Sequence, residues 1–345
     1  MLNYKKRILG IDLIRVLACF SVIMLHVSRP FFYREGTWNT GETLILSKII
    51  YYLGTSAVPL FFMVNGFFLV NRSKMSINYI KKKIGLIMIP ILGWNLIIFI
   101  PKLILKKNEN SYLEMVLGSL VQKGFFSQFW FLGALIIILL LVPILNKIMT
   151  KSVKLYFTIL IMFLVISWGI DLYNHFSDCV PLEANVTQTF RLWTWLSYYM
   201  IGGLIGKLEK KINFVNLNKP LKYLLVIMSP IIVIYSICNI TWISSVFAEY
   251  NYDNILIFIW IVIIFLLCIS FAYFSKYEVK IIESISKCSF GIYIVHIIVL
   301  RIFEKIFVFN GIVINLIAVL GIFLISWLIT FVFSKVPYLS KLVVF

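Results

Sequence analysis

Long apolar runs separated by short polar segments dominate the chain. A helix needs about 20 consecutive, mostly apolar residues to cross the roughly 30 Å hydrocarbon core of a bilayer. The pattern predicts ten membrane-spanning helices, the second long enough to tilt or overhang the bilayer and the sixth short. They cover residues 8–29, 44–70, 84–101, 127–146, 155–173, 191–206, 223–243, 255–275, 288–309 and 312–333. Residues 102–126 mix apolar and charged positions, and we expect an interfacial or re-entrant piece there.

The basic residues between these runs predict the orientation of the chain. Lys and Arg are concentrated in the cytoplasmic loops of membrane proteins. With the N-terminus in the cytoplasm, 21 of the 32 Lys and Arg residues fall in inside segments and seven in outside segments. We therefore expect both termini in the cytoplasm. The apolar run from Ile8 is too long for a signal peptide, so it is interpreted as a retained first span.

Composition narrows the class of protein. Of the 345 residues, 61% are hydrophobic and 13% are charged, whereas soluble domains carry about 25% charged residues. This excludes a soluble enzyme, a disordered chain and a disulfide scaffold. We expect an all-α, polytopic transmembrane helix bundle that forms one domain over residues 1–345, with no appended soluble domain.

The net charge of +18 would suggest nucleic acid in a soluble protein. Here the basic residues border apolar runs, so we expect the lipid bilayer and no nucleic acid as a partner. A basic cytoplasmic face suits anionic lipid or a phosphorylated cytosolic ligand. The five cysteines show no CxxC or CxxH spacing, so no metal site is predicted.

Few ionisable residues lie inside the predicted spans, and such residues are functional-site candidates because their burial in lipid is costly. Asp171 stands near the outer end of the fifth span, and Arg191 stands just outside the sixth. The others are Asp12, Arg15, His26, Lys48, His296, Arg301, Glu304 and Lys305. Glu304 with Arg301 or Lys305 is interpreted as a structural ion pair within one helix.

The first span is the most informative. Arg15 and His26 are 11 residues apart, which places them on one helix face about 16 Å apart along the axis. The guanidinium fork can hold phosphate or carboxylate, and a histidine can take a proton from an alcohol. Asp12, three residues before Arg15, can compensate its charge. In the alternative, the Asp12–Arg15 pair snorkels to the cytoplasm and His26 bonds a neighbouring helix.

Four other residues are weaker candidates for supporting roles. Tyr293 and His296 are neighbours on one face of the ninth span, where they either support catalysis or bond across helices. Asn65 is a polar residue in the middle of the second span. Trp130 opens the fourth span at the outer interface, where Trp usually anchors a helix.

Four segments carry a family resemblance. The first span has Arg15 followed by ten residues and His26. Residues 59–67 read PLFFMVNGF, residues 129–132 read FWFL and residues 289–296 read SFGIYIVH. These four segments resemble, in the same order, four motifs of the membrane-bound acyltransferase-3 family. The motifs are the arginine and histidine of its first span, a P-x-F-F-x-x-x-G-F stretch, a W-F-L segment and a late S-Y-G-I-Y-x-x-H segment.

The resemblance implies transfer of an acyl group, usually acetyl from cytosolic acetyl-CoA, to a hydroxyl of an extracytoplasmic polysaccharide or glycan precursor. It implies that Arg15 holds the donor and that His26 is either the general base or a transient acyl carrier. Acetyl-CoA would be the acyl donor, and the location would be the cell membrane. The Ile-, Lys- and Asn-rich composition suggests an AT-rich bacterial genome, and we therefore expect the membrane to be a bacterial plasma membrane.

Two competing hypotheses remain at this stage. The first is a polysaccharide or small-molecule transporter or exporter of the same membrane fold, which would move substrate independently of acetyl-CoA. The second is a non-catalytic assembly partner, which would tolerate substitution of Arg15, His26 and His296 alike. An exporter does not need the Arg15–His26 stripe at that depth, and we rank O-acetyl transfer first.

Overall fold

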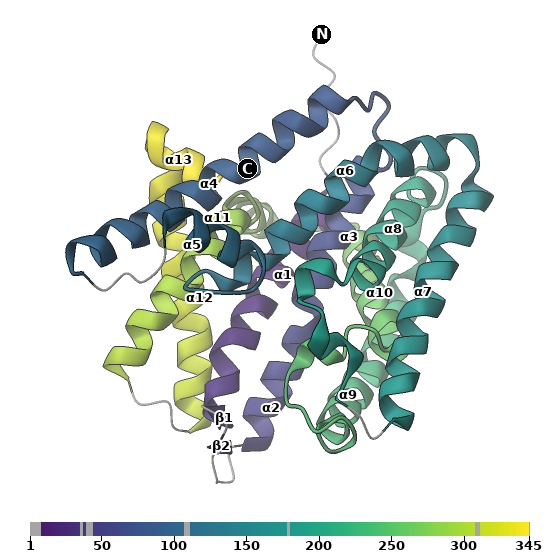
Figure 1. The fold of residues 1–345 in the computed structure, drawn as a ribbon. Helices are drawn as coiled ribbons and strands as arrows, with labels where there is room; N and C mark the ends of the chain where they lie inside the picture. The colour runs from purple at the N-terminus through teal and green to yellow at the C-terminus, as the bar shows by residue number, and fades with distance from the viewer. Residues whose placement is uncertain are drawn as a thin grey trace.

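The computed structural model describes residues 8–34, 37–38, 44–106, 111–177, 180–307 and 311–344. These ranges fold into a bundle of α-helices with one short antiparallel strand pair (Figure 1). The predicted all-α polytopic helix bundle is confirmed. The helices and strands are α1 (Leu9–Ser28), β1 (Tyr33–Arg34), β2 (Thr37–Trp38), α2 (Leu44–Leu53), α3 (Ala57–Leu69), α4 (Ile77–Ile104), α5 (Tyr112–Leu120), α6 (Trp130–Lys151), α7 (Val153–Phe176), α8 (Leu192–Leu208), α9 (Asn218–Trp242), α10 (Ile255–Ser270), α11 (Lys276–Ile306), α12 (Ile312–Lys335) and α13 (Pro337–Val343).

Each of the ten predicted spans is helical in the structure. Among the described residues, eight helical stretches are long and apolar enough to cross a membrane. The other two predicted spans correspond to α10, with 16 residues, and α8, with 17 residues. The mixed segment 102–126 contains the short helix α5, which packs on α4 through a hydrogen bond from Asn95 Nδ2 to Ser119 Oγ at 3.2 Å.

Several boundaries differ from those predicted. The second span is not one continuous α-helix, because a 3₁₀ turn, η2 (Gly54–Ser56), separates α2 from α3. Helix α11 begins at Lys276, where Ser275 and Glu278 form a capping box, 12 residues before the predicted start. Polar first turns of this kind extend a helix beyond the apolar run by which a span is recognised.

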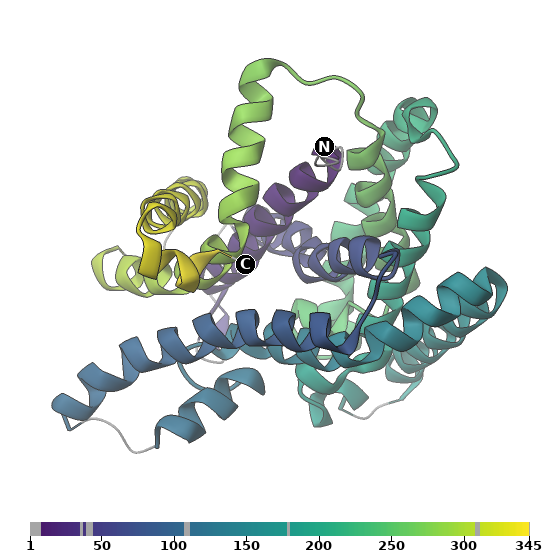
Figure 2. The same ribbon diagram turned by 90° about the horizontal axis from the view of Figure 1, so that it is seen from above.

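Helix α1 occupies the centre of the bundle, and α4 and α6 run obliquely to it (Figure 1). It packs against α3, α11 and α12. Viewed from above, α4 and α5 form one flank of the molecule (Figure 2). The beginning of α1 and the strand pair mark opposite ends of the bundle, which we name the inner end and the outer end after the predicted orientation.

Helices α3 and α8 approach closely because each helix has a glycine that faces the backbone of the other. A Cβ atom on Gly66 would overlap the carbonyl oxygen of Tyr199, and one on Gly202 would overlap that of Met63. Small residues permit such close packing of membrane helices. The contact fixes α3, which carries Phe61 and Asn65, against the rest of the bundle.

Candidate functional site

Two cavities lie along α1, one toward each end. The inner cavity has a volume of about 710 Å³, and Arg15 lines it. The outer cavity has a volume of about 250 Å³, and His26 lines it. The two residues predicted to form one stripe therefore face two separate spaces. Ile8 and Val344 both line the inner cavity, so the two ends of the described chain lie on the same side of the bundle, as an even number of spans requires.

The inner cavity is basic. Arg15 is joined there by Lys83 of α4 and Lys287 of α11. Asp12 is buried and accepts a hydrogen bond from Ser286 Oγ at 2.6 Å, and its carboxylate lies 3.5 Å from the Arg15 guanidinium. The predicted Asp12–Arg15 pair is present, and Ser286 also holds its carboxylate. The side chain of Arg15 is 35% exposed and lines the cavity.

Lys83 is a site residue without a local signal in the sequence. It is the last of three consecutive lysines, Lys81 to Lys83, that the charge pattern assigns to a cytoplasmic segment. In the structure the first two are exposed, whereas Lys83 is half-buried and lines the inner cavity. Its exposure and its place in the cavity lining, which depend on the tertiary fold, distinguish it from its two neighbours.

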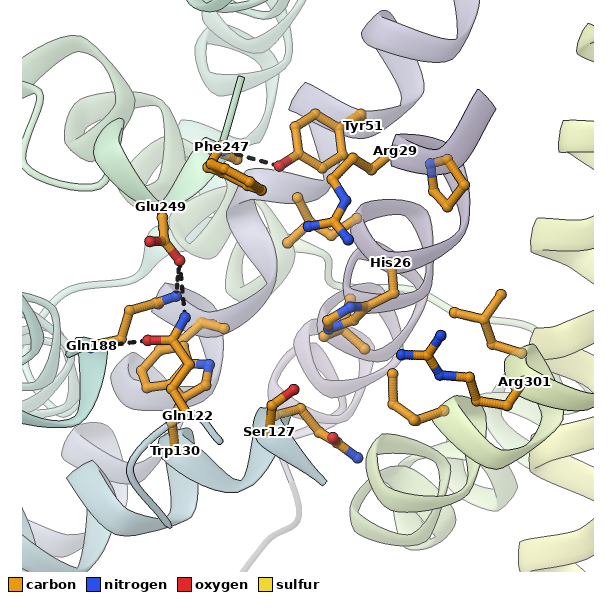
Figure 3. A pocket seen from close by; sticks show the side chains of 18 of the residues that line it. His26, Arg29, Tyr51, Gln122, Ser127, Trp130, Gln188, Phe247, Glu249 and Arg301 are labelled. Atoms are coloured by element: carbon orange, nitrogen blue, oxygen red, sulfur yellow. Dashed lines mark hydrogen bonds between the residues drawn. The ribbon is translucent and has the colours of Figure 1, made fainter. Parts of the chain in front are cut away.

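The outer cavity combines aromatic, amide and charged side chains. His26 and Arg29 project into it from the end of α1, and Arg301 approaches from α11 (Figure 3). Trp130, Gln122, Gln188 and Glu249 line it on the side away from Arg301. Trp130 is buried and packs on Trp195, with ring centroids 5.1 Å apart, so its expected role as an anchor at the lipid interface is wrong.

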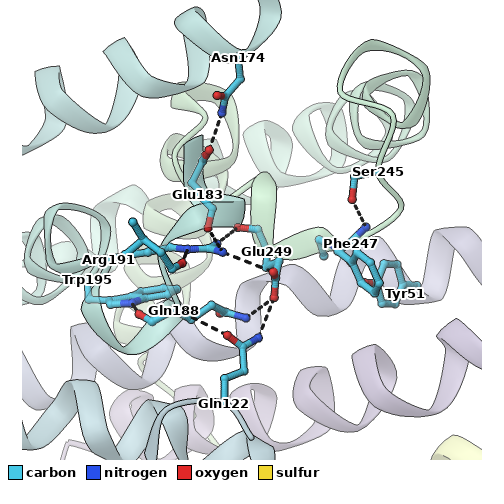
Figure 4. A network of polar contacts seen from close by, with 12 residues as sticks. Tyr51, Gln122, Asn174, Glu183, Gln188, Arg191, Trp195, Ser245, Phe247 and Glu249 are labelled. Atoms are coloured by element: carbon cyan, nitrogen blue, oxygen red, sulfur yellow. Dashed lines mark hydrogen bonds and ion pairs between the residues drawn. The ribbon is translucent and has the colours of Figure 1, made fainter. Parts of the chain in front are cut away.

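A hydrogen-bond network around Glu249 forms the far wall of the outer cavity (Figure 4). Its carboxylate accepts from Gln122 Nε2 at 3.0 Å and from Gln188 Nε2. Arg191, which is 3% exposed, lies 3.4 Å from the same carboxylate and donates to the Glu183 carbonyl at 2.8 Å. Arg191 thus compensates the charge of Glu249. It supports the cavity wall without lining the cavity.

The end of the same loop holds a buried carboxyl group, Asp253, just before α10 begins. It accepts hydrogen bonds from Thr194 Oγ1 at 2.6 Å and Trp193 Nε1 at 3.2 Å. Burial disfavours the charged form and raises the pKa of Asp253 to about 7, against the lowering effect of these hydrogen bonds. Burial also raises the pKa of Tyr252, which lines the outer cavity.

His26 and His296 face each other from α1 and α11, with ring centroids 5.3 Å apart. His296 Nδ1 lies 3.2 Å from the Ile292 carbonyl oxygen, which favours the tautomer with the proton on Nδ1 and a lone pair on Nε2. His296 Nε2 is buried with no hydrogen-bond partner among the described residues. Nor does His26 form a hydrogen bond with any of them, so its ring nitrogens are left for a ligand.

Three aromatic rings pack together in the lining of the inner cavity, and we call them the aromatic wall. They are those of Phe61, Phe131 and Tyr293, with centroids 5.6–6.2 Å apart. All three line the inner cavity. Tyr293 Oη donates to the backbone carbonyl of Gln128, a residue of the outer cavity. This hydrogen bond links the aromatic wall of the inner cavity to a residue that lines the outer one.

The remaining predicted candidates occupy different places. Asn65 lines the inner cavity, and its Nδ2 donates to the Phe61 carbonyl at 2.9 Å. Asp171 accepts a hydrogen bond from Asn254 at 2.8 Å, and Lys48 lies 6.0 Å from the Phe32 ring centroid; neither lines a described cavity. Arg301 and Glu304 form the predicted ion pair at 3.0 Å, and both line the outer cavity.

Comparison with known proteins places the chain in a family. The acyltransferase-3 family model, described as an acyltransferase domain, matches residues 8–331. An amino-acid racemase of Enterococcus faecalis is 26% identical over 208 residues, which are 57% of this chain and 27% of that protein. The chain thus matches about a quarter of that relative's length. No solved structure matches it significantly.

The family match agrees with the four resembling segments, which lie within the matched range. Three of the helices that carry them, α1, α3 and α11, surround the aromatic wall and the His26–His296 pair. The chain is a multi-pass membrane protein with an acyltransferase domain, and it belongs to the acyltransferase-3 family.

Proposed function

We propose that this protein transfers an acyl group, acetyl in the simplest case, from a cytosolic acyl-CoA to a hydroxyl of an extracytoplasmic carbohydrate in the cell envelope. One observation carries the proposal. Arg15 and His26 line cavities toward opposite ends of one helix, and Tyr293 of the inner cavity donates a hydrogen bond to Gln128 of the outer cavity. A donor and an acceptor can thus approach from opposite faces of the membrane and meet near the wall.

The inner cavity fits an acyl-CoA donor. Its volume of about 710 Å³ lies within the roughly 300–1,000 Å³ typical of small-molecule sites. Arg15, Lys83 and Lys287 supply positive charge for the phosphates of CoA, and a guanidinium binds two phosphate oxygens at once. An apolar acyl group is compatible with Phe61, Phe131 and Tyr293 at the end of the cavity.

The outer cavity suits a carbohydrate acceptor. Sugars present hydroxyl groups together with apolar ring faces. Tyr51, Trp130 and Phe247 offer aromatic surfaces for those faces. The amide and carboxylate groups of the Glu249 network offer hydrogen-bond partners held in fixed positions.

His26 is the proposed general base. A neutral imidazole takes the proton of the acceptor hydroxyl while the oxygen attacks the thioester carbonyl carbon. The carbon–sulfur bond then breaks, and the imidazolium returns the proton to the CoA thiolate. His296 lies next to His26 and supports its position. In the alternative route His26 Nε2 attacks first and carries the acyl group before the acceptor takes it.

Turnover of labelled acetyl-CoA by the protein in nanodiscs, with a panel of envelope glycans as acceptors, tests the proposal. We expect His26→Gln to abolish turnover. The remaining histidine of the chain, His175, lies on α7 and bonds Tyr235 at 3.2 Å. His175→Gln is therefore the matched control and should retain turnover. Label trapped on wild-type protein after an acid quench, and absent from His26→Gln, would identify the acyl-carrier route.

Unchanged turnover in folded His26→Gln protein would overturn the role of His26. Absence of acyl-CoA binding and turnover in well-folded wild-type protein, with glycan flux into vesicles, would favour the transporter hypothesis instead.

A further inference from the structure

Gln128 is a buried side chain whose hydrogen-bonding groups are unused. It lies in a 3₁₀ turn, η3 (Ser127–Phe129), directly before α6, and is 4% exposed. Neither its Nε2 nor its Oε1 has a hydrogen-bond partner among the described residues. Burying an unpaired carboxamide is unfavourable, so a group in this state suggests that something absent from the free protein pairs with it.

Two other glutamines in the outer cavity show the contrast. Gln122 and Gln188 both donate their Nε2 groups to the Glu249 carboxylate. Gln128 lines the same cavity but stands outside that network. Among these three glutamines, Gln128 is the one whose side-chain N–H groups are left for a ligand.

The backbone of Gln128 is fixed at the boundary of the two cavities. Its carbonyl accepts the hydrogen bond from Tyr293, a residue of the aromatic wall. Tyr293 precedes His296 by one helical turn on α11, and the His296 ring packs on that of His26. Phe126 and Phe129 stack on each other beside the turn, with centroids 4.8 Å apart. The carboxamide is thereby held on the segment that joins the wall to the histidine pair.

We propose that Gln128 is a catalytic residue that stabilises the oxyanion of the transfer reaction, an inference that rests on the proposed function. As the acceptor oxygen bonds to the thioester carbon, the carbonyl π electrons move to its oxygen, and Gln128 Nε2 donates a hydrogen bond to this oxyanion. When the carbonyl re-forms, the carbon–sulfur bond breaks and the proton held by His26 passes to the departing sulfur. A neutral, buried hydrogen-bond donor on a turn whose backbone is fixed is suited to this task.

The test combines kinetics with stability. In Gln128→Leu we expect kcat for acyl transfer to fall about 100-fold, since loss of one oxyanion donor typically costs about 10²–10³ in kcat. The Kd of a non-reactive thioether analogue of acetyl-CoA should stay within about threefold of wild type. The apparent melting temperature should be equal or higher, because the variant no longer buries unpaired polar atoms. A merely structural glutamine would lower it.

Gln128→Glu is the second variant, because it keeps the size of the side chain and replaces the N–H donor by oxygen. It should lose as much kcat as Gln128→Leu. A kcat near that of wild type in either variant, or lost stability together with lost analogue binding, would overturn the role of Gln128. Failure of the proposed function itself is distinguishable, since in that case the well-folded wild-type protein would show no acyl-CoA turnover.

Discussion

At the scale of single residues, several charged side chains around the two cavities are paired with residues of opposite charge. Glu249 is neutralised by Arg191, and Arg301 by Glu304. Asp12 is held by Ser286, and its contact with Arg15 is long at 3.5 Å. The side chain of Arg15 is 35% exposed and lines the inner cavity beside this pair.

Lys83 offers a direct test of the inner cavity. Its ammonium group lines the cavity, whereas that of Lys82 on the same helix is exposed. We expect Lys83→Met to raise KM for acyl-CoA about tenfold or more, because a hydrogen bond to a charged phosphate is typically worth about 1.5–3 kcal/mol. Lys82→Met, the matched control, should change KM less than about twofold. Equal effects of both substitutions in steady-state kinetics would contradict a donor site at Lys83.

Asp253 predicts a pH dependence of stability. Its pKa is raised to about 7 in the folded protein, whereas an unfolded Asp titrates near 3.9. Between these values the folded state binds more protons than the unfolded one, so the free energy of unfolding falls as pH rises from about 4 to about 7. Above about pH 7 this contribution is constant.

Asp253→Asn removes this titration and keeps an oxygen that can accept from Thr194. The difference in melting temperature between the two proteins should therefore change between pH 4.5 and 8. The melting temperature of the variant should rise relative to that of the wild type as pH rises. Parallel curves would show that Asp253 does not titrate in this window.

At the scale of elements, the glycine contact between α3 and α8 sets the position of the wall residue Phe61. Gly66→Ala should destabilise the protein by about 1–3 kcal/mol, the usual cost of overpacking, because its Cβ meets the Tyr199 backbone. Gly169 of α7 and Gly321 of α12 have no neighbouring atom near an added Cβ. Alanine there should be neutral or stabilise by up to about 1 kcal/mol. Thermal unfolding in one detergent measures all three variants, and a stable Gly66→Ala protein would refute the close contact.

Hydropathy predicted the existence of the elements better than their ends. All ten apolar runs became helices, because lipid forces each spanning segment to satisfy its own backbone hydrogen bonds. The start of α11 at Lys276 and of α4 at Ile77 lies outside the apolar runs and depends on the caps Ser275 and Ser76. The turn at Gly54–Ser56 was not predicted, since it interrupts the helix without interrupting the hydropathy.

At the scale of the whole molecule, residues on one helix could be related from the sequence, whereas partners from different helices could not. The 3.6-residue period predicted that Tyr293 and His296 are neighbours, and their ring centroids are 6.1 Å apart. Lys83 and Gln128 reach the site only through the packing of α4 and α6 on the central helices. The division of the Arg15–His26 stripe into two cavities likewise depends on side chains from α3, α6 and α11.

The two-cavity arrangement predicts sidedness in proteoliposomes. Acetyl-CoA is added outside the vesicles and a glycan acceptor is trapped inside. The amount of product should then be proportional to the fraction of protein molecules whose N-terminal tag is accessible to protease from outside, because Arg15 lies at the N-terminal end of α1. With donor inside and acceptor outside, the amount of product should be proportional to the fraction of molecules whose N-terminal tag is protected. Product formed only when both substrates share a compartment would contradict transfer across the membrane.

The aromatic wall also bears on how the membrane keeps its ion gradients. Two aqueous cavities that joined would give protons and cations a leak through the middle of the protein. Phe61, Phe131 and Tyr293 line the inner cavity, and Tyr293 bonds to Gln128 of the outer cavity. An ion stripped of water among such rings is strongly disfavoured. An acetyl group has no charge and little polar surface. On the proposed reaction, the wall would thus act as an insulator that lets acyl groups be exported at no expense to the membrane potential.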